Sequence, residues 1–334
     1  MTEEIWSGVR CTSKVSILFL AVFSLLLSGC GREIENAYDV NTTISAYTFK
    51  NDYGENTAPA FARDICVVNG DIIEGVDLSR SEASGLFDLT DKRTLLAKNA
   101  NERLNPASLT KTMTAMIALK YGRLEDVLIA SKNVVLTESG AQMIPLHEGD
   151  RMTLEEALHA LLLYSANDAA VMVAEYISGS VEEFANLMNK EALALGATNT
   201  HFVNPHGLTA EEHYTTVYDL YLIFKEAVKY EKFIEIINKD SYDLTYTDMS
   251  GASKSLSIKN TNAYLSGSRE MPQGIRVIGG KTGTTDAAGS CLIILSYDEN
   301  QRPYISCVLK ADDREGLYDQ MSWLLSSISR LTGQ

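Results

Sequence analysis

The chain has 334 residues, of which 45% are hydrophobic and 22% are charged. This composition excludes a wholly disordered chain and supplies enough apolar side chains for one large core or two smaller ones. The formal net charge of -15 argues against nucleic acid, or any polyanionic surface, as the main partner, because such partners need a clustered excess of lysine and arginine.

The first predicted element is an N-terminal export signal. Arg10 and Lys14 precede an apolar run over residues 15–27, which is too short for a comfortable membrane span and is typical of a signal-peptide core. The run ends in Leu27-Ser28-Gly29-Cys30, which resembles a bacterial lipobox. We therefore expect residues 1–29 to be a lipoprotein signal peptide and Cys30 to be the lipid anchor. An uncleaved anchor helix with an incidental cysteine is the alternative.

A polar stretch follows the predicted lipid anchor. Residues 30–58 lack any sustained hydrophobic period, so we expect a lipidated tether that holds the folded part off the bilayer. Residues 59–334 show no repeat and no second independent domain, and are expected to form one enzyme domain.

The cysteines do not predict a disulfide framework. Without Cys11 and the lipidated Cys30, three thiols remain, and an odd number cannot pair completely. Cys291 and Cys307 lie in neighbouring apolar segments, so a disulfide between them stays open. Free buried cysteines that act as small hydrophobic side chains are the favoured interpretation.

The domain begins with strands and continues with helices. Strands are predicted at 65–68, 83–89 and 94–97, the last two as a hairpin. Thr153 and Glu156 form a capping-box pattern at the start of one helix. The helices are predicted at about 108–120, 154–163, 168–177, 181–195 and 216–238.

Strand character returns near the C-terminus. Strands are predicted at 276–283, 290–297 and 304–310, followed by an amphipathic helix over 314–331. Strands at both ends of a helical block predict an α/β (α+β) fold, in which one sheet is flanked by helices and an all-helical lobe at about 120–260 is inserted.

Ser108-Leu109-Thr110-Lys111 is the first of three patterns that carry chemistry. Its i, i+3 spacing at the start of a helix places the hydroxyl of Ser108 and the amine of Lys111 on one face. A serine nucleophile needs a base within reach, and a lysine can be that base only if burial or another cation lowers its pKa. Lys281 could supply the second cation. In isolation the same pattern fits a helix cap and a solvated lysine.

Ser165-Ala166-Asn167 is the second pattern, and it lies between two predicted helices. A loop there would present Ser165 for proton relay and Asn167 for binding a substrate amide. A turn between helices with Asp168 as the N-cap explains the tripeptide equally well.

Gly279-Gly280-Lys281-Thr282-Gly283-Thr284-Thr285 is the third pattern, and it falls in a predicted strand. Glycines weaken a strand unless another backbone comes close. A peptide substrate added alongside the strand would need that clearance, with Lys281 and Thr282 reaching its terminal carboxylate. A bulge or tight turn is the alternative.

Together with Asn204-Pro205-His206-Gly207-Leu208, these ordered patterns resemble the low-molecular-mass D-alanyl-D-alanine carboxypeptidases, which are penicillin-binding serine peptidases, over about residues 60–331. The resemblance implies a β-lactamase/transpeptidase-like fold with a five-stranded antiparallel sheet. Ala166 stands where the family more usually has glycine or aspartate.

The resemblance also implies a role for each matching residue. Ser108 attacks the D-Ala-D-Ala carbonyl, Lys111 takes its proton, and Ser165 with Lys281 relays it to the leaving D-alanine. The amides of Ser108 and Thr284 form the oxyanion hole, water hydrolyses the acyl-enzyme, and β-lactams inhibit by stalling as esters. The residues implied to bind substrate are Asn167, Lys281, Thr282, Gly283 and Thr284. No cofactor and no metal are expected.

Other functions stay open at this point. A serine β-lactamase shares the fold but needs a carboxylate for deacylation, and no segment resembles the loop that bears it. A D,D-endopeptidase would use identical residues, and a silent penicillin-binding sensor would be expected to lose Ser108 or Lys111. A metal peptidase is disfavoured, because His201, His206 and His213 lack the His-Glu-x-x-His spacing. The expected partners are peptidoglycan stem peptides on the outer face of the bacterial cytoplasmic membrane.

Overall fold

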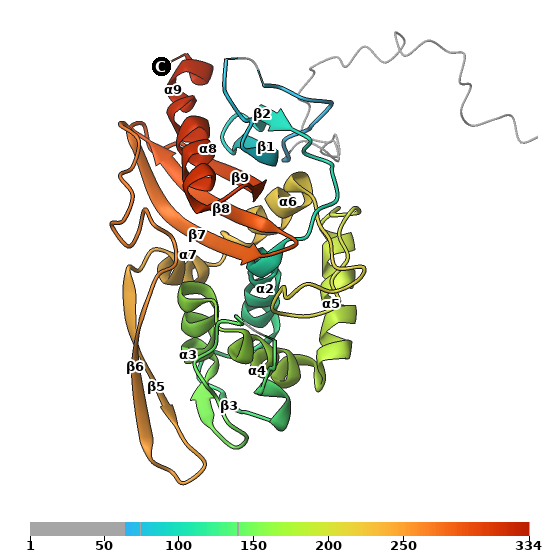
Figure 1. The fold of residues 1–334 in the computed structure, drawn as a ribbon, viewed down its shortest axis with the longest axis vertical. Coiled ribbons are helices and arrows are strands. Elements are labelled where there is room, and N and C mark those ends of the chain that lie inside the picture. The colour runs from blue at the N-terminus through green and yellow to red at the C-terminus, as the bar shows by residue number, and fades with distance from the viewer. Residues whose placement is uncertain (1–63, 74, 139, 334) are drawn as a thin grey trace, which may run out of the picture. The chain divides into compact units, whose positions relative to one another are not determined.

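The computed structural model describes residues 64–73, 75–138 and 140–333 (Figure 1). The predicted signal peptide, the lipid anchor at Cys30 and the tether to residue 58 lie outside these residues. Among the helices of the described ranges, none has the length and apolar character needed to cross a membrane.

The centre of the fold is a five-stranded sheet in which all neighbouring strands are antiparallel. Its strand order, β2-β1-β9-β8-β7, pairs the first hairpin with the last strand of the chain and leaves β7 at an edge. The predicted five-stranded antiparallel sheet is confirmed. The strands are β1 (Ser81–Asp88), β2 (Arg93–Lys98), β7 (Ile275–Thr285), β8 (Gly289–Asp298) and β9 (Pro303–Ala311).

Both faces of this sheet are buried, which explains why its last strands read as nearly continuous apolar runs. The closing helix α8 (Arg314–Ser326) covers one face (Figure 1). Leu292 and Ile294 of β8 pack with apolar side chains of this helix. On the other face, Ile293 and Leu295 join the larger core that the remaining helices form. The sheet is therefore the middle layer between two helical layers.

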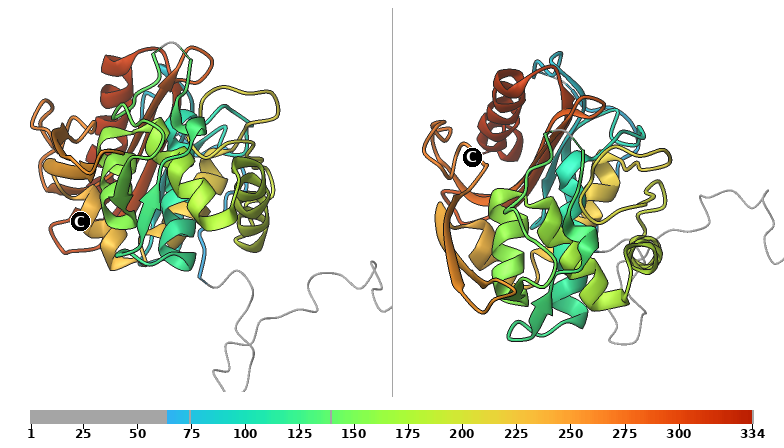
Figure 2. Two further views of the ribbon diagram at one scale, coloured as in Figure 1. Left: turned by 90° about the horizontal axis from the view of Figure 1, so that it is seen from below. Right: turned by 60° about the horizontal axis from the view of Figure 1, so that its bottom comes forward.

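Most helices lie between the two groups of strands in the sequence. At their centre is α2 (Lys111–Tyr121), which is buried from Lys111 to Ala118, and Figure 2 shows it enclosed by the other helices. A helix that is buried all round is a rigid support for residues at its start. The described part of the chain also contains α3 (Leu154–His159), α4 (Asn167–Ser178), α5 (Val181–Ala194), α6 (Val217–Ala227), α7 (Glu231–Ile237), α9 (Ile328–Thr332) and the 3-10 helix η3 (Lys132–Val134).

The prediction of an all-helical lobe at about 120–260 is wrong. This part of the chain also contains a four-stranded antiparallel sheet, in the order β3-β4-β5-β6. Two of its strands have only three residues, too few to show a period, and the β5–β6 hairpin is mostly polar, with Leu244 and Ile258 as its buried residues. The strands are β3 (Val127–Ile129), β4 (Arg151–Thr153), β5 (Ser241–Thr247) and β6 (Ser253–Lys259).

Several predicted elements change at their ends. The helix predicted over 216–238 breaks between α6 and α7, and the one over 314–331 breaks at Ser327. The predicted strand at 65–68 does not form. Tyrosine side chains take its backbone hydrogen bonds instead, because the amide of Cys66 donates to the Tyr221 hydroxyl and its carbonyl accepts from Tyr218.

The three cysteines of the described chain are free and buried, as the sequence favours. Cys307 of β9 lies opposite Ile293 of β8, so Cys291 is two residues away along its strand. A diagonal position across a strand pair does not give the geometry of a disulfide.

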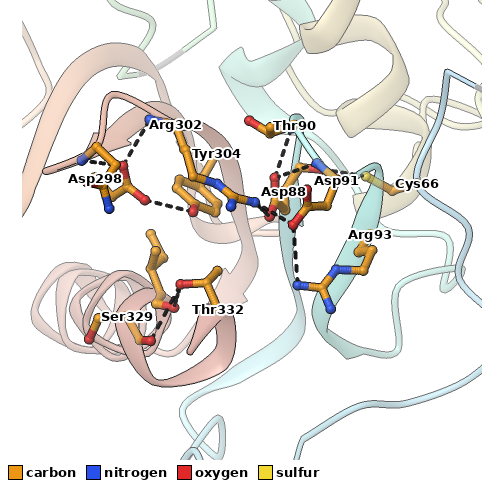
Figure 3. A network of polar contacts seen from close by, with 12 residues as sticks. Cys66, Asp88, Thr90, Asp91, Arg93, Asp298, Arg302, Tyr304, Ser329 and Thr332 are labelled. Atoms are coloured by element: carbon orange, nitrogen blue, oxygen red, sulfur yellow. Dashed lines mark hydrogen bonds and ion pairs between the residues drawn. The ribbon is translucent and has the colours of Figure 1, made fainter. Parts of the chain in front are cut away.

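A polar network closes one end of the central sheet (Figure 3). Arg302 donates from Nη2 to Asp88 Oδ2 at 2.7 Å and to Asp91 Oδ2 at 2.5 Å. Tyr304 donates to Asp298 Oδ2 at 2.9 Å. Because Asp88 is fully buried, its charge needs this partner, and the network ties the β1–β2 turn to the β8–β9 turn.

Candidate active site

Ser108 lies in a short 3-10 helix, η2 (Ala107–Thr110), that leads directly into α2. The prediction of a regular helix from Ser108 is therefore wrong in its first turn. Ala107, immediately before the serine, has a positive φ of 47°, a conformation that costs a non-glycine residue energy. This turn presents the half-buried Ser108 at the start of a helix whose body is fixed in the core.

Lys111 is fully buried, and its amine is surrounded by three oxygen atoms. Nζ lies 2.9 Å from Ser108 Oγ, 2.7 Å from Asn167 Oδ1 and 2.6 Å from the carbonyl oxygen of His206. The amide oxygen and the carbonyl oxygen can only accept hydrogen bonds. A neutral amine has two N–H bonds and one lone pair, so donating to these two oxygens leaves the lone pair for the Ser108 hydroxyl.

Two effects lower the pKa of Lys111 well below its usual value. Burial is the larger, and the charge of Lys281 acts in the same direction, while Asp168 opposes them. The sequence predicted both causes. The structure thus places a lysine that can be neutral against the candidate nucleophile, which is the arrangement that a serine needs for activation.

Ser165 ends an irregular helical segment. Half of the predicted capping box forms, since Thr153 Oγ1 accepts from the amide of Glu156, while the Glu156 carboxylate binds Tyr242 and Thr245 instead. After α3 the helix widens into a π-helix, η4 (Ala160–Tyr164). Ser165 then adopts a positive φ of 67°. Such π segments and strained residues concentrate at functional sites, and here they turn the Ser165 hydroxyl toward Lys281, whose Nζ donates to it at 3.0 Å.

Asn167 opens α4, and the N-cap is Ala166 rather than Asp168. The Asp168 carboxylate instead accepts hydrogen bonds from the amides of Ile144, Leu146 and Ala169. Asn167 Oδ1 is bound to Lys111, while its Nδ2 makes no hydrogen bond to another described residue. The structure therefore gives Asn167 a contact with the candidate base that the sequence did not predict.

Lys281 is 1% exposed and lies on the edge strand β7. Its Nζ donates to Ser165 Oγ and, at 2.8 Å, to the carbonyl of Thr282. Burial lowers the pKa of Lys281 to about 7. Both protonation states are then accessible near neutral pH, as a proton relay requires.

The glycines of β7 give clearance to the protein's own backbone. A Cβ on Gly279, whose φ is +154°, would lie 2.1 Å from the carbonyl oxygen of Ile237, and one on Gly283 would lie 2.8 Å from the amide nitrogen of Ser108. We expected these glycines to make room for a peptide substrate, and for Gly279 and Gly283 that expectation is wrong. Gly283 instead allows β7 to approach the turn that carries Ser108.

A cleft of about 250 Å³ joins the three patterns. Its lining residues do not include an aspartate or a glutamate, within the described part of the chain. A larger hollow of about 500 Å³, near Gln273 and Ser329, contains none of the motif residues, so its size does not make it the active site. The predicted site residues that line the cleft are Ser108, Ser165, Asn167, Thr282, Gly283 and Thr284.

Arg314 also lines this cleft, and the sequence did not identify it as a site residue. It is the first residue of α8, and its Nη2 donates to the carbonyl of Thr261 at 3.1 Å. Thr261 in turn shares a 2.6 Å hydrogen bond with the hydroxyl of Thr282. The only signal in the sequence was an arginine at the start of the closing helix, which is common on any surface helix.

The three histidines near the Asn-Pro-His-Gly-Leu segment have separate environments. His206 contributes its backbone carbonyl to Lys111, and burial lowers the pKa of its side chain to about 3. His213 is 2% exposed, and burial lowers its pKa to about 4. Among the described residues, no group of three histidine, cysteine, aspartate or glutamate side chains is arranged to hold a metal ion.

Comparison with known proteins gives consistent matches. A family profile described as D-alanyl-D-alanine carboxypeptidase matches residues 75–313. D-alanyl-D-alanine carboxypeptidase DacF of Bacillus subtilis is 37% identical over 229 residues, which are 66% of this chain and 55% of DacF. DacD of Escherichia coli is 30% identical over 249 residues, which are 72% of this chain and 61% of DacD.

Solved structures match as well. The crystal structure of a Streptomyces DD-transpeptidase superposes with a TM-score of 0.70 at 25% identity, over 78% of this chain and 99% of that chain. The chain spans between 55% and 61% of the length of the two curated relatives above.

Proposed function

The chain belongs to the D-alanyl-D-alanine carboxypeptidase family, and we propose that it removes the terminal D-alanine from peptidoglycan stem peptides through an acyl-enzyme on Ser108. One observation carries this proposal. Asn167 and His206 accept both hydrogen bonds that a neutral Lys111 can donate, which leaves its lone pair to the Ser108 hydroxyl.

Acylation begins when Ser108 Oγ attacks the carbonyl carbon of the D-Ala-D-Ala bond while Lys111 accepts the hydroxyl proton. The amides of Ser108 and Thr284 donate to the oxyanion, a contribution that is commonly the largest in acyl transfer. Ser165 and Lys281 then pass a proton to the nitrogen of the leaving D-alanine. The 3.0 Å contact between these two side chains and the pKa of Lys281 near 7 support this relay.

The terminal carboxylate of the substrate binds where the cleft is cationic. We assign this role to Lys281, Thr282 and Thr284, and we add Arg314 because it lines the same cleft. Without a lining aspartate or glutamate in the described chain, no negative charge opposes the carboxylate there. A substrate in extended conformation lies along the free edge of β7, as peptides do at exposed sheet edges.

β-Lactams acylate Ser108 in the same way, and the resulting ester persists. Rapid hydrolysis of a penicilloyl ester would need a carboxylate to activate water. Asp168, a buried carboxylate that follows Asn167 in the sequence, is held by three backbone amides and does not line the cleft. This favours a penicillin-binding peptidase over a β-lactamase.

Release of free D-alanine tests the reaction itself. The purified chain is incubated with a diacylated tripeptide that ends in D-Ala-D-Ala and, separately, with cross-linked muropeptides. We expect D-alanine from the tripeptide and intact cross-links, because the cationic end of the cleft selects a free carboxylate. Cleavage of the cross-links at a comparable rate would assign the chain as a D,D-endopeptidase instead.

We further propose that Cys30 carries the lipid that holds the chain on the outer face of the bacterial cytoplasmic membrane. Support comes from the small residues Ser28 and Gly29 at the end of the apolar run. Labelled palmitate should be incorporated into the wild-type chain and lost in Cys30→Ala. Cys11→Ala is the matched control and should keep the label, whereas labelling that persists in Cys30→Ala contradicts the anchor.

A further inference from the structure

The peptide bond between Ala107 and Ser108 connects the interior of the protein to the oxyanion hole. A trans peptide unit is planar, so the carbonyl of Ala107 and the amide N–H of Ser108 point in opposite directions as one rigid group. Whatever holds the Ala107 oxygen therefore also sets the direction in which the Ser108 amide points. Ala107 itself has a strained φ of 47°, so this orientation needs support from neighbouring residues.

Two neighbours hold the Ala107 oxygen. The hydroxyl of Thr110 donates to it at 2.8 Å, and Thr110 is fully buried. Gly207 packs so closely that a Cβ there would lie 1.8 Å from this oxygen, and it has a positive φ of 87°. The Thr110 hydroxyl has a single hydrogen, which it donates to Ala107, so any further hydrogen-bond partner of this hydroxyl must be a donor.

His213 is that donor. The amide of Val203 can only donate, and it lies 3.1 Å from Nδ1 of His213, so Nδ1 is the acceptor and the neutral ring carries its hydrogen on Nε2. Nε2 lies 2.9 Å from the Thr110 hydroxyl. The hydrogen bonds therefore run in one direction, from the Val203 amide to His213, from His213 to Thr110, and from Thr110 to the Ala107 carbonyl.

We propose that His213 is a positioning residue for the oxyanion hole, acting through Thr110 on the peptide unit that carries the Ser108 amide. The inference rests on the proposed function and adds to it a residue that does not touch the substrate. A hydrogen bond accepted by the Ala107 carbonyl also polarises the peptide, which makes the Ser108 N–H a stronger donor to the oxyanion.

The test separates binding from acylation. The full chain is reacted with a chromogenic β-lactam, and the dissociation constant of the first complex is measured apart from the rate constant of acylation. Thr110→Val removes the hydroxyl at nearly constant volume, and we expect the acylation rate to fall about 10-fold to 100-fold, since losing an oxyanion-hole donor outright costs about 10²–10³-fold. The dissociation constant should change little.

Three further variants distinguish positioning from a loss of stability. Thr110→Ser restores the hydroxyl and should acylate at nearly the wild-type rate. His213→Phe should resemble Thr110→Val, and the double variant should lose no more than the larger single loss, because both remove the same chain of bonds. His201→Gln changes a histidine that binds the carbonyl of Glu212 instead, and should acylate normally.

The inference is overturned if Thr110→Val acylates at the wild-type rate, if Thr110→Ser is as slow as Thr110→Val, or if the losses of the single variants multiply in the double variant. If His213→Phe does not fold, the comparison of Thr110→Val with Thr110→Ser decides alone. A wild-type chain that is not acylated at all would instead overturn the proposed function, and this inference with it.

Discussion

Replacing Ser108 by alanine is expected to abolish covalent labelling of the chain by a fluorescent penicillin. In the proposed mechanism the acyl-enzyme ester forms on Ser108 Oγ, so the variant has no atom to carry the label. Turnover of D-Ala-D-Ala peptides should fall by at least about 10⁴-fold, as it does when a nucleophilic serine is removed elsewhere. The measurement is in-gel fluorescence together with D-alanine release.

The fold should survive this change. Ser108 is half-buried, and its hydroxyl has Lys111 as its hydrogen-bond partner among the described residues, so thermal melting should shift only slightly. Ser290→Ala is a suitable control, because Ser290 also lines the cleft but lies on β8. Labelling that persists in Ser108→Ala, or that disappears equally in Ser290→Ala, contradicts the assignment of the nucleophile.

Replacing Lys111 by methionine is expected to slow acylation by about 10²–10⁴-fold, the usual contribution of a general base. Methionine fills a similar volume without a lone pair, so Ser108 loses its proton acceptor. The acylation rate constant is measured with a fluorescent penicillin. Long incubations are needed, because the variant keeps the Ser108 hydroxyl and should still be labelled slowly.

Stability should fall only moderately in this variant. Burying methionine avoids the cost of desolvating an amine, while the oxygens of Asn167 and His206 lose a donor. Lys120→Met is the matched control, because Lys120 lies on the same helix but is partly exposed and paired with Glu191. Acylation of Lys111→Met within about tenfold of the wild-type rate would exclude Lys111 as the base.

Local patterns predicted much of this fold. The strands of the central sheet, the closing helix and the N-cap at Thr153 all depend on residues close together in the sequence. The hydrophobic pattern did not predict elements that are short or polar, such as β3 and β4. It also wrongly predicted a strand at Cys66, where distant side chains take the backbone hydrogen bonds.

The candidate site was partly predictable because some of its residues belong to short motifs. Ser108, Lys111, Ser165 and Lys281 were identified from short motifs, and the structure brings them together around one cleft or in contact with its lining. The roles that we propose for Arg314 and His213 were not predicted. Arg314 stands alone at a helix start, and the role of His213 depends on a hydrogen bond to Thr110 across 103 positions of sequence.

The sequence by itself determined which chemical groups the protein has, their order, and the family to which they point. Only the tertiary structure decided the protonation states and hydrogen-bond partners of those groups. Lys111 can be neutral because it is buried and because the charge of Lys281, far away in the sequence, lies close enough to lower its pKa. Its two acceptors, which come from positions 56 and 95 residues away, leave its lone pair for Ser108. Desolvation and hydrogen bonding depend on distance in space, and no local pattern of residues contains that distance.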